Sequence, residues 1–521
     1  MIHGISAALL LIASLTCGCG EKNTVQETPA VKLEAAPATL SFNAAGGCQT
    51  LSVKSSAMPY AVPGDSWLST KVGQFASNSS EVTVTVSENP AAEIRESYVS
   101  IVCGDDKQKV TISQAAAEKP AEPETDKDKD KDNDDDFLAE VTRGDNLAWK
   151  MAERLGMGWN LGNQMDSYNN GVADETGWGN PKATQATFDG LKAKGFTSVR
   201  IPTTWMGHIG EAPDYKIDEA WMNRVAELVG YAEKTGLNVI LNLHHDGADN
   251  TNWLNIKKAA ASEAENKAII EKYSAVWKQI AEKFADKGDF LIFEAFNEIH
   301  DGGWGWGDNR SDGGTQYKIL NSWTQAFVDA VRSTGGKNSE RYLGIPGYSA
   351  NPDLTMEYME LPKDSAKDKL LVAVHCYDPY LYTLECQYDE WGHTAKNNAA
   401  PNTEKEIVDV MAKLKTKYVD AGIPVYLGET GCSNRPTERQ KKFQKYYLEF
   451  FYKACSDYGI PAFFWDNGNE GSGRESSAVI HHGTGEYIGD GKMMVEAMKK
   501  ATFTDTDSYT LRSVYDSAPQ N

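Results

Sequence analysis

The chain has 521 residues and a formal net charge of −22 at pH 7, and 40% of its residues are hydrophobic. This length predicts two or three domains, and the hydrophobic content is sufficient for a large core. The negative charge argues against nucleic acid and anionic lipid as partners, because binding to phosphates depends on Lys and Arg. A soluble, neutral substrate is compatible with it.

The N-terminus carries an apolar run over residues 5–15, followed by Cys17-Gly18-Cys19. The run has the length of a signal-peptide core and is too short to span a bilayer. Small residues followed by cysteine resemble a bacterial lipoprotein signal over residues 1–19, with Cys19 as the expected lipidation site and Cys17 as the alternative. We therefore expect export, with a lipid anchor in the outer membrane at the cell surface, or otherwise a periplasmic or secreted protein.

Residues 36–117 contain short β-branched segments separated by Gly, Pro, Asn and Ser, as is typical of strands joined by turns. The pattern predicts a small all-β sandwich domain. In an exported protein, Cys48 and Cys103 of this domain could form a disulfide. Cys376, Cys386, Cys432 and Cys455 lie further along with no metal-binding spacing, and buried free thiols explain them at least as well.

Four short motifs in this domain resemble BACON, a carbohydrate-binding-associated module of exported Bacteroidetes proteins. They are Trp67-Leu68, Asn89-Pro90, Arg95 and residues 110–114. The resemblance leaves two roles open, sugar binding and a spacer. Residues 118–136 follow and are rich in Asp and Lys with no apolar face, which predicts an acidic flexible linker.

From residue 137 to 508, short apolar segments alternate with segments of helical spacing. Glycine often precedes the next apolar segment, where the end of a helix favours it. The pattern predicts an α/β fold, a (β/α)8 TIM barrel. Its eight expected strands are residues 157–161, 198–202, 239–245, 290–298, 342–345, 370–377, 425–429 and 462–465.

Polar and aromatic side chains collect at the ends of these strands, where such barrels place their active sites. They are Arg200, His244, His245, Asn297, Glu298, His375, Tyr377, Glu429 and Trp465. Glycoside cleavage needs one protonated carboxyl to donate to the leaving oxygen and one ionised carboxylate to attack or to orient water. Glu298 and Glu429 end strands that face each other across the barrel, so both carboxyls can reach one bond.

Some of these residues have a second interpretation. Arg200 could hold Glu429 ionised, or it could only neutralise the deeper Glu294. Trp465 offers a flat floor for a pyranose ring, or it fills the core. His244 and His245 are adjacent, and neighbouring strand residues point to opposite faces, which argues against a metal site made by both.

The C-terminal region resembles glycoside hydrolase family 5 across residues 158–468. The ordered motifs are Gly158-Trp-Asn-Leu-Gly-Asn163, Val199-Arg-Ile-Pro202, Leu241-Asn-Leu-His-His245, Phe293-Glu-Ala-Phe-Asn-Glu298, His375-Cys-Tyr377, Leu427-Gly-Glu429 and Phe464-Trp-Asp-Asn-Gly468. The segment Glu175-Thr-Gly-Trp178-Gly-Asn-Pro181 further resembles subfamily 4, whose members are endo-β-1,4-glucanases acting on cellulose, mixed-linkage glucan or xyloglucan.

The resemblance implies a retaining double displacement without a metal or a cofactor. Glu298 matches the acid/base of the family, and Glu429 matches its nucleophile. Retention predicts that the two carboxyls lie about 5–5.5 Å apart. The expected supporting and substrate-binding residues are Arg200, His244, His245, Asn297, His375, Tyr377, Trp465, Asn163 and Trp178.

We therefore expect a monomeric enzyme that cleaves β-1,4-glucan internally. Xyloglucan is the favoured polysaccharide, cellulose or mixed-linkage glucan comes next, and mannan or xylan is held in reserve. A non-catalytic glycan-binding surface lipoprotein is the alternative from another class, and the presence of both Glu298 and Glu429 argues against it. A metal-dependent barrel hydrolase would lose activity with a chelator, which we do not expect.

Overall fold

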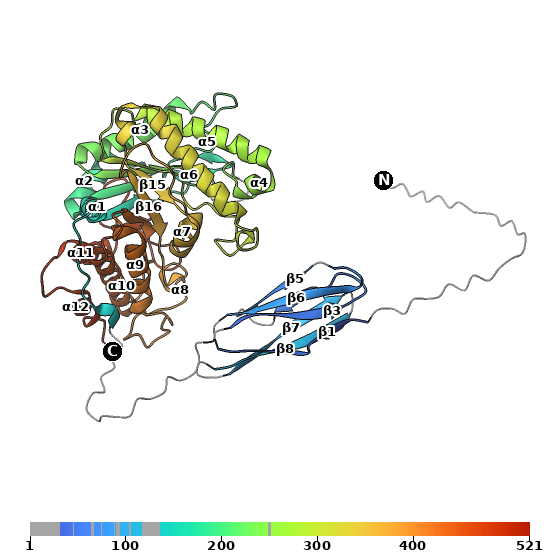
Figure 1. Ribbon diagram of the computed structural model, residues 1–521. Coiled ribbons are helices and arrows are strands. Elements are labelled where there is room, and N and C mark those ends of the chain that lie inside the picture. Colours follow the sequence, from blue (N-terminus) through green and yellow to red (C-terminus); the bar gives the residue numbers. More distant parts are fainter. Residues whose placement is uncertain are drawn as a thin grey trace, which may run out of the picture. The chain divides into compact units, whose positions relative to one another are not determined.

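The computed structural model describes residues 32–44, 46–63, 67–73, 75–87, 89, 94–103, 106–116, 136–247 and 252–520. The chain divides into two units, residues 1–131 and 132–521, which are described separately (Figure 1). The predicted signal with Cys17 and Cys19 and almost all of the predicted linker lie outside the described residues. The lipid anchor and the domain borders stay predictions. Among the described helices, none combines the length and apolar character needed to cross a bilayer.

The first unit is built from two four-stranded sheets, with strand orders β1-β3-β6-β5 and β2-β8-β7-β4. Its strands are β1 (Glu34–Ala36), β2 (Thr39–Phe42), β3 (Gly47–Lys54), β4 (Tyr60–Pro63), β5 (Leu68–Val72), β6 (Ser79–Val86), β7 (Arg95–Cys103) and β8 (Asp106–Gln114). Alternate residues are buried, as in β6, where Val82, Val84 and Val86 enter the core and Glu81 does not. This alternation confirms the predicted all-β domain.

Cys48 and Cys103 are both free thiols, so the disulfide considered above is not formed. Cys48 is exposed on β3, where its sulfur lies 3.2 Å from the Thr85 hydroxyl. Cys103 is buried on β7 and donates to the carbonyl of Ala57 at 3.4 Å. The two side chains belong to different sheets, and one points outward while the other points into the core.

The second unit contains a closed barrel of parallel strands in the order β9-β12-β13-β14-β15-β16-β17-β18, which confirms the predicted (β/α)8 architecture. The strands are β9 (Met157–Leu161), β12 (Ser198–Ile201), β13 (Asn238–Asn242), β14 (Leu291–Glu294), β15 (Leu343–Pro346), β16 (Leu370–His375), β17 (Val425–Thr430) and β18 (Ala462–Asp466). A small hairpin, β10 (Tyr168–Asn169) and β11 (Val172–Ala173), follows β9.

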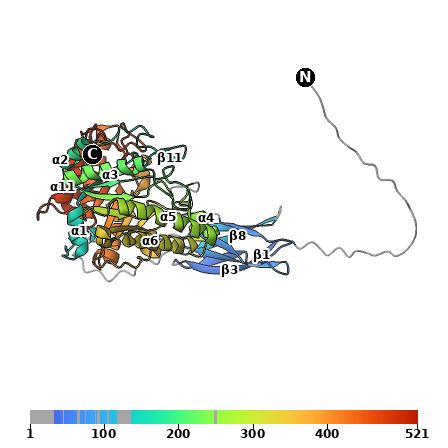
Figure 2. The ribbon, with the colours of Figure 1, turned by 90° about the horizontal axis from the view of Figure 1, so that it is seen from above.

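Helices surround the barrel (Figure 1), and the view from above shows α3, α5 and α6 running along its outside (Figure 2). They are α1 (Leu147–Leu155), α2 (Gln185–Lys194), α3 (Glu219–Thr235), α4 (Ile256–Ala261), α5 (Glu263–Lys283), α6 (Thr315–Ser333), α7 (Pro352–Tyr358), α8 (Tyr380–Thr383), α9 (Glu404–Leu414), α10 (Glu438–Asp457), α11 (Gly491–Phe503) and α12 (Leu511–Tyr515). Gly195 and Gly236 end α2 and α3 with φ of 102° and 74°, the left-handed conformation that glycine adopts easily.

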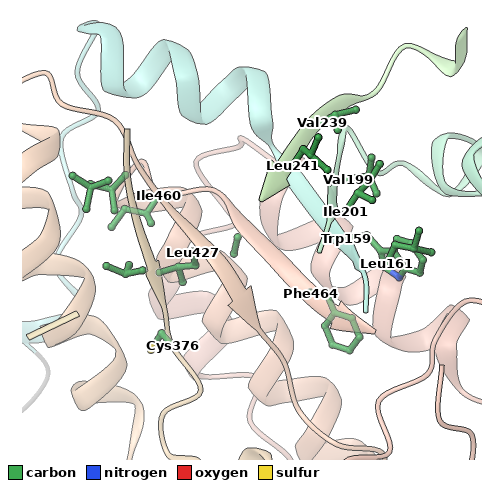
Figure 3. Packing of buried hydrophobic residues seen from close by; sticks show 14 of the residues in the cluster. Trp159, Leu161, Val199, Ile201, Val239, Leu241, Cys376, Leu427, Ile460 and Phe464 are labelled. Carbon is green, nitrogen blue, oxygen red and sulfur yellow. The ribbon is translucent and has the colours of Figure 1, made fainter. Parts of the chain in front are cut away.

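Successive residues of a barrel strand point alternately outward, toward the helices, and inward, into the barrel, so they pack in two separate hydrophobic clusters. Val199, Ile201 and Leu241 belong to the layer between strands and helices, part of which is seen in Figure 3. Ile240 on the alternate face joins a smaller buried cluster inside the barrel. Arg200 pairs in register with Ile240, so it shares the inward face and lies within the barrel rather than beneath the helices.

Four of the strands, β12, β13, β14 and β16, end one to four residues earlier than we expected, and the difference is largest for β13 and β14. β13 ends at Asn242 and β14 at Glu294, which pair with each other in register. His244 and Glu298 therefore lie in the loops beyond their strands. The backbone there no longer forms strand-to-strand hydrogen bonds. The His244 N–H, for example, donates to the carbonyl of Thr203, in the loop after β12, at 2.8 Å.

Candidate active site

A buried guanidinium connects the carboxylates inside the barrel. Arg200 is fully buried and donates from Nη2 to Glu294 Oε1 at 2.7 Å and from Nη1 to Glu429 Oε1 at 2.8 Å. It also donates to the side-chain oxygens of Asn297 (2.7 Å) and Asn160 (3.1 Å). Burial lowers the pKa of Arg200, but the two carboxylates outweigh that effect and raise it above its usual value. Arg200 therefore does not serve Glu294 alone, since it also binds Glu429.

Glu294 is a permanent counterion in this network. Its Oε1 also accepts from Asn242 Nδ2 at 2.9 Å, and its Oε2 accepts from the Tyr426 hydroxyl at 2.6 Å. Burial raises the pKa of Glu294, but the charge and hydrogen bonds of Arg200 outweigh it and lower the pKa below its usual value. Gly344 makes room for this contact, because a Cβ there would lie 2.2 Å from the Tyr426 oxygen. A carboxylate with this many donors has no proton to give.

The Tyr426 bond offers a direct test of the network. We expect Tyr426→Phe to lower the free energy of unfolding by about 1.5–3 kcal/mol, because Glu294 would lose a donor that water cannot replace. Tyr452→Phe is the matched control, since the buried Tyr452 hydroxyl has no hydrogen-bond partner among the described residues. Urea unfolding followed by circular dichroism measures both variants. Equal losses in the two would contradict the role assigned to Tyr426.

The two glutamates predicted for catalysis meet above this layer. One carboxylate oxygen of Glu298, one of Glu429 and a ring nitrogen of His375 all lie within 4.8 Å of one another. His375 Nδ1 shares a 2.6 Å hydrogen bond with Glu298 Oε1, and the Tyr377 hydroxyl donates to Glu429 Oε2 at 3.0 Å. β14 and β17 are separated by β15 and β16. The carboxyls thus approach from two sides of the barrel mouth, although not from directly opposite strands.

Their surroundings give the two carboxyls different protonation behaviour. Burial raises the pKa of Glu298 to about 7, although the charge of Arg200 opposes the rise. Burial also raises the pKa of Glu429, and there the charge of Arg200, which donates a hydrogen bond to this carboxylate, opposes the rise. Burial lowers the pKa of His375 to about 4, so its imidazole is neutral at pH 7. Near neutral pH, Glu298 can therefore hold a proton while Glu429 is the better stabilised anion.

The expectation that His244 and His245 point apart is wrong. Their rings are 4.5 Å apart, and one ligand atom from each lies within 4.8 Å of a carboxylate oxygen of Asp166. The alternation rule does not apply because β13 ends before both residues. His245 Nδ1 donates to the Asp166 backbone carbonyl at 2.9 Å. His, Asp and Glu are the donors that zinc binds, so this set and the set of Glu298, His375 and Glu429 have the composition of a metal site.

Aromatic rings border the glutamates on one side. Trp465 lies parallel to His244 with ring centres 5.7 Å apart. Trp178 is 43% exposed, lies 5.3 Å from the His245 ring and donates from its indole N–H to the Tyr168 carbonyl. The two rings thus lie near the site, and the sugar-binding roles expected for Trp465 and Trp178 stay predictions.

The motif residue Asn163 shapes the loop that follows β9. It has a positive φ of 54° in the turn after β9, and its carbonyl accepts from Asn180 Nδ2 at 3.0 Å. Asn180 also donates to the Asn467 carbonyl, which ties the loops after β9 and β18 together. Glu175, from the motif that contains Trp178, is buried and accepts from Arg224 at 2.6 Å.

Sequence reasoning missed several polar residues around the site, namely Asn160, Asn242, Tyr426 and Asp166. A signal was present for the two asparagines, because each lies in a short, mostly apolar buried strand where an amide must find a partner. Asp166 is fully buried, and burial raises its pKa to about 7. Nothing in the local pattern distinguished Tyr426 or Asp166.

Comparison with known proteins agrees with this geometry. The family model for cellulase, glycosyl hydrolase family 5, matches residues 162–471, and the BACON model, a putative N-terminal binding domain, matches residues 55–115. The chain is 54% identical to a solved broad-specificity endoglucanase from Bacteroides salanitronis, with a TM-score of 0.68 over 70% of this chain and 97% of that one.

Two further proteins extend the likeness. A solved Bacteroidetes-affiliated family 5 cellulase linked with a polysaccharide utilisation locus is 48% identical, with a TM-score of 0.71 over 72% of this chain and 98% of that one. A xyloglucan-specific endo-β-1,4-glucanase of Bacteroides ovatus is 28% identical over 82% of this chain and 84% of its own length. The chain therefore belongs to glycosyl hydrolase family 5 and carries a BACON domain ahead of its catalytic barrel.

Proposed function

We propose that this protein is a retaining, endo-acting β-1,4-glucanase that favours xyloglucan, with Glu298 as acid/base and Glu429 as nucleophile. The observation that carries the proposal is the pair of carboxyls at the barrel mouth. Their nearest oxygens lie within 4.8 Å of each other, and their surroundings favour a proton on Glu298 and a charge on Glu429.

The short separation supports retention. Inverting enzymes hold their carboxyls about 6.5–9.5 Å apart to admit a water molecule beneath the sugar, whereas retaining enzymes hold them about 5–5.5 Å apart. A gap within 4.8 Å between oxygens of Glu298 and Glu429 leaves room for the anomeric carbon and the leaving oxygen between them.

The first step forms a covalent intermediate. A carboxylate oxygen of Glu429 attacks the anomeric carbon, the bond from that carbon to the leaving oxygen breaks, and Glu298 gives its proton to that oxygen. Arg200 and Tyr377 donate to the two oxygens of Glu429 and orient the attack. Neutral His375, bonded to Glu298, holds the acid in place without adding a charge.

The second step reverses the roles. Glu298, now ionised, takes a proton from water, and the resulting hydroxyl attacks the anomeric carbon as the bond to Glu429 breaks. Two inversions at one carbon give a product with the original β configuration. Trp465 beside His244 and Trp178 beside His245 provide flat surfaces for the glucosyl residues that stay bound during both steps.

The choice of xyloglucan is supported by the Bacteroides ovatus relative, whose name specifies xyloglucan and whose likeness covers most of this chain. The solved relative named a cellulase supports cellulose or mixed-linkage glucan as the second choice, and the relative named a broad-specificity endoglucanase is consistent with activity on more than one glucan. We expect the highest kcat/KM on xyloglucan when purified protein is compared on xyloglucan, carboxymethylcellulose, mixed-linkage glucan, mannan and xylan.

Early products should be oligosaccharides, measured by size over time, because an endo-acting enzyme cleaves within the chain. Highest activity on another polysaccharide would overturn the xyloglucan preference alone. Release of monosaccharide only would overturn the endo mode. Binding to xyloglucan without cleavage of any polymer would favour the glycan-binding alternative over an enzyme.

A further inference from the structure

A loop next to the acid/base residue exposes two tryptophan rings. This platform loop comprises residues 299–310 and follows Glu298 directly. Trp304 is 56% exposed and Trp306 is 80% exposed, the highest value among the exposed large hydrophobic side chains that the structure describes. Two large apolar rings held in water on one short loop indicate a binding surface rather than core packing.

The platform loop is held by a buried polar network. The Asp301 carboxylate accepts from the backbone N–H groups of Gly303 (2.9 Å) and Asn309 (3.0 Å), and the Asp301 N–H donates to the Tyr348 hydroxyl. The Tyr348 hydroxyl in turn donates to Gln316 Oε1 on α6 at 2.7 Å. The loop is thus fixed before any ligand arrives, which reduces the entropy lost on binding.

The glycines of the platform loop are required by close packing. A Cβ on Gly307 would lie 2.3 Å from Asp301 Oδ1, and one on Gly303 would lie 2.4 Å from the Gly307 Cα. Trp304 between them has a φ of 50°, which is a strained conformation for a bulky residue. The fold therefore accepts backbone strain in order to present this ring to solvent.

Each ring has a partner behind it. The His300 ring stacks on Trp304 at 4.1 Å with an angle of 28°, and the Arg310 guanidinium lies 4.7 Å from the centre of the Trp306 ring. Arg310 is itself fixed by a 2.6 Å bond from Nε to the Gly305 carbonyl. Two supported, flat apolar surfaces are the arrangement that suits the C–H faces of pyranose rings.

The position of the platform loop identifies which part of the ligand it meets. His300 lies two residues after Glu298, a distance that the chain limits to about 7 Å between Cα atoms. Around the closed barrel, β14 is four strands from β18 in either direction, so the platform loop and Trp465 leave opposite sides of the mouth. Trp178, in the loop after β9, contacts His245, next to the His244 ring on which Trp465 stacks.

We propose that Trp304 and Trp306 bind the glucosyl residues on the leaving-group side of the same β-glucan chain that is cleaved. The inference rests on the proposed function, because Glu298 marks the leaving-group side only if it is the proton donor. The platform then holds the leaving chain during the first step and offers the same surface to a sugar acceptor in the second.

The test compares substrates that do and do not reach the platform. An aryl β-cellotrioside places only its aryl group on the leaving side, whereas xyloglucan and mixed-linkage glucan extend across it. We expect Trp306→Ala and Trp304→Ala each to lower kcat/KM on the polymers about tenfold, as for an aromatic residue at the centre of an interface. Hydrolysis of the aryl cellotrioside should stay within about twofold of wild type, and Trp306→Phe should retain most polymer activity.

Transfer to added cellobiose provides a second readout. Both alanine variants should give a smaller ratio of transfer product to hydrolysis product, because the acceptor would lose its stacking surface. The matched control is Phe503→Ala, which removes an exposed aromatic ring beside Gly156 at the opposite end of the barrel. It should change neither the ratio of transfer product to hydrolysis product nor the ratio of activity on polymers to activity on the aryl cellotrioside.

The outcomes separate the two proposals. Suppose that wild type cleaves the polymers and that both Trp→Ala variants keep the wild-type ratios of polymer to aryl cellotrioside activity and of transfer to hydrolysis. The proposed role of Trp304 and Trp306 is then refuted, while the proposed enzymatic function is not. An equal loss on the aryl cellotrioside would also refute that role, since the rings would then serve the site as a whole. If wild type cleaves neither kind of substrate, the proposed function itself fails.

Discussion

Glu429→Ala is expected to lower kcat on polysaccharides at least about 10⁴-fold, because no covalent intermediate can form without the carboxylate. Stability should change little by comparison. Arg200 would lose one partner but keep Glu294, to which it donates from both Nε and Nη2. Reducing-sugar release from the best polymer, followed for hours at high enzyme concentration, measures the residual rate.

Azide then assigns the role of Glu429. A small anion can enter the space left by the carboxylate and attack an activated aryl glucoside chain directly, giving a glycosyl azide of α configuration. Glu153→Ala, which removes an exposed acid of α1, should behave like wild type with and without azide. A β-configured azide, or activity above about one hundredth of wild type, would contradict the assignment of Glu429 as nucleophile.

Glu298→Gln is expected to lower kcat/KM on polysaccharides by about 10²–10⁴-fold, the range that general acid catalysis supplies. The loss should be much smaller on aryl glycosides with a nitrophenol leaving group, since such a group departs without a proton. Measuring both substrate types on one enzyme preparation makes the comparison internal. Equal losses on both would show that Glu298 is not the proton donor.

The pH dependence follows from the same residue. The pKa of Glu298 is about 7, and only its protonated form can donate, so wild-type kcat/KM should fall as the pH rises through about 7. The decline at low pH should follow protonation of Glu429. On activated aryl glycosides, Glu298→Gln should lack the alkaline decline, because no proton is then lost from position 298.

Most of the fold was predictable because apolar periodicity is local. The strands and the helix-ending glycines Gly195 and Gly236 depend on residues a few positions apart. Strand ends were less predictable. β14 stops at Glu294 although the apolar pattern continues through Phe296, because the partner strand β15 pairs only with residues 293 and 294. That limit depends on a distant segment.

The candidate site was predictable where polar residues end strands, since a barrel brings such ends together. It was not predictable where contacts depend on the neighbour across the barrel. Tyr426 reaches Glu294 over 132 positions of sequence, and only the missing side chain of Gly344 permits it. Trp304 and Trp306 carry no periodic signal, because glycine-rich loop geometry alone decides that they face solvent.

The arrangement around Arg200 has a consequence for the charge of the bound sugar. Before substrate binds, the one positive charge of Arg200 faces two carboxylates, those of Glu294 and Glu429. The buried centre therefore carries a net charge of −1, a surplus of one negative charge. Positive charge that develops on the sugar during bond breaking is matched by this surplus, and formation of the ester discharges it. A uronic acid at the same position would meet uncompensated repulsion, so the buried centre favours polymers made of neutral sugars.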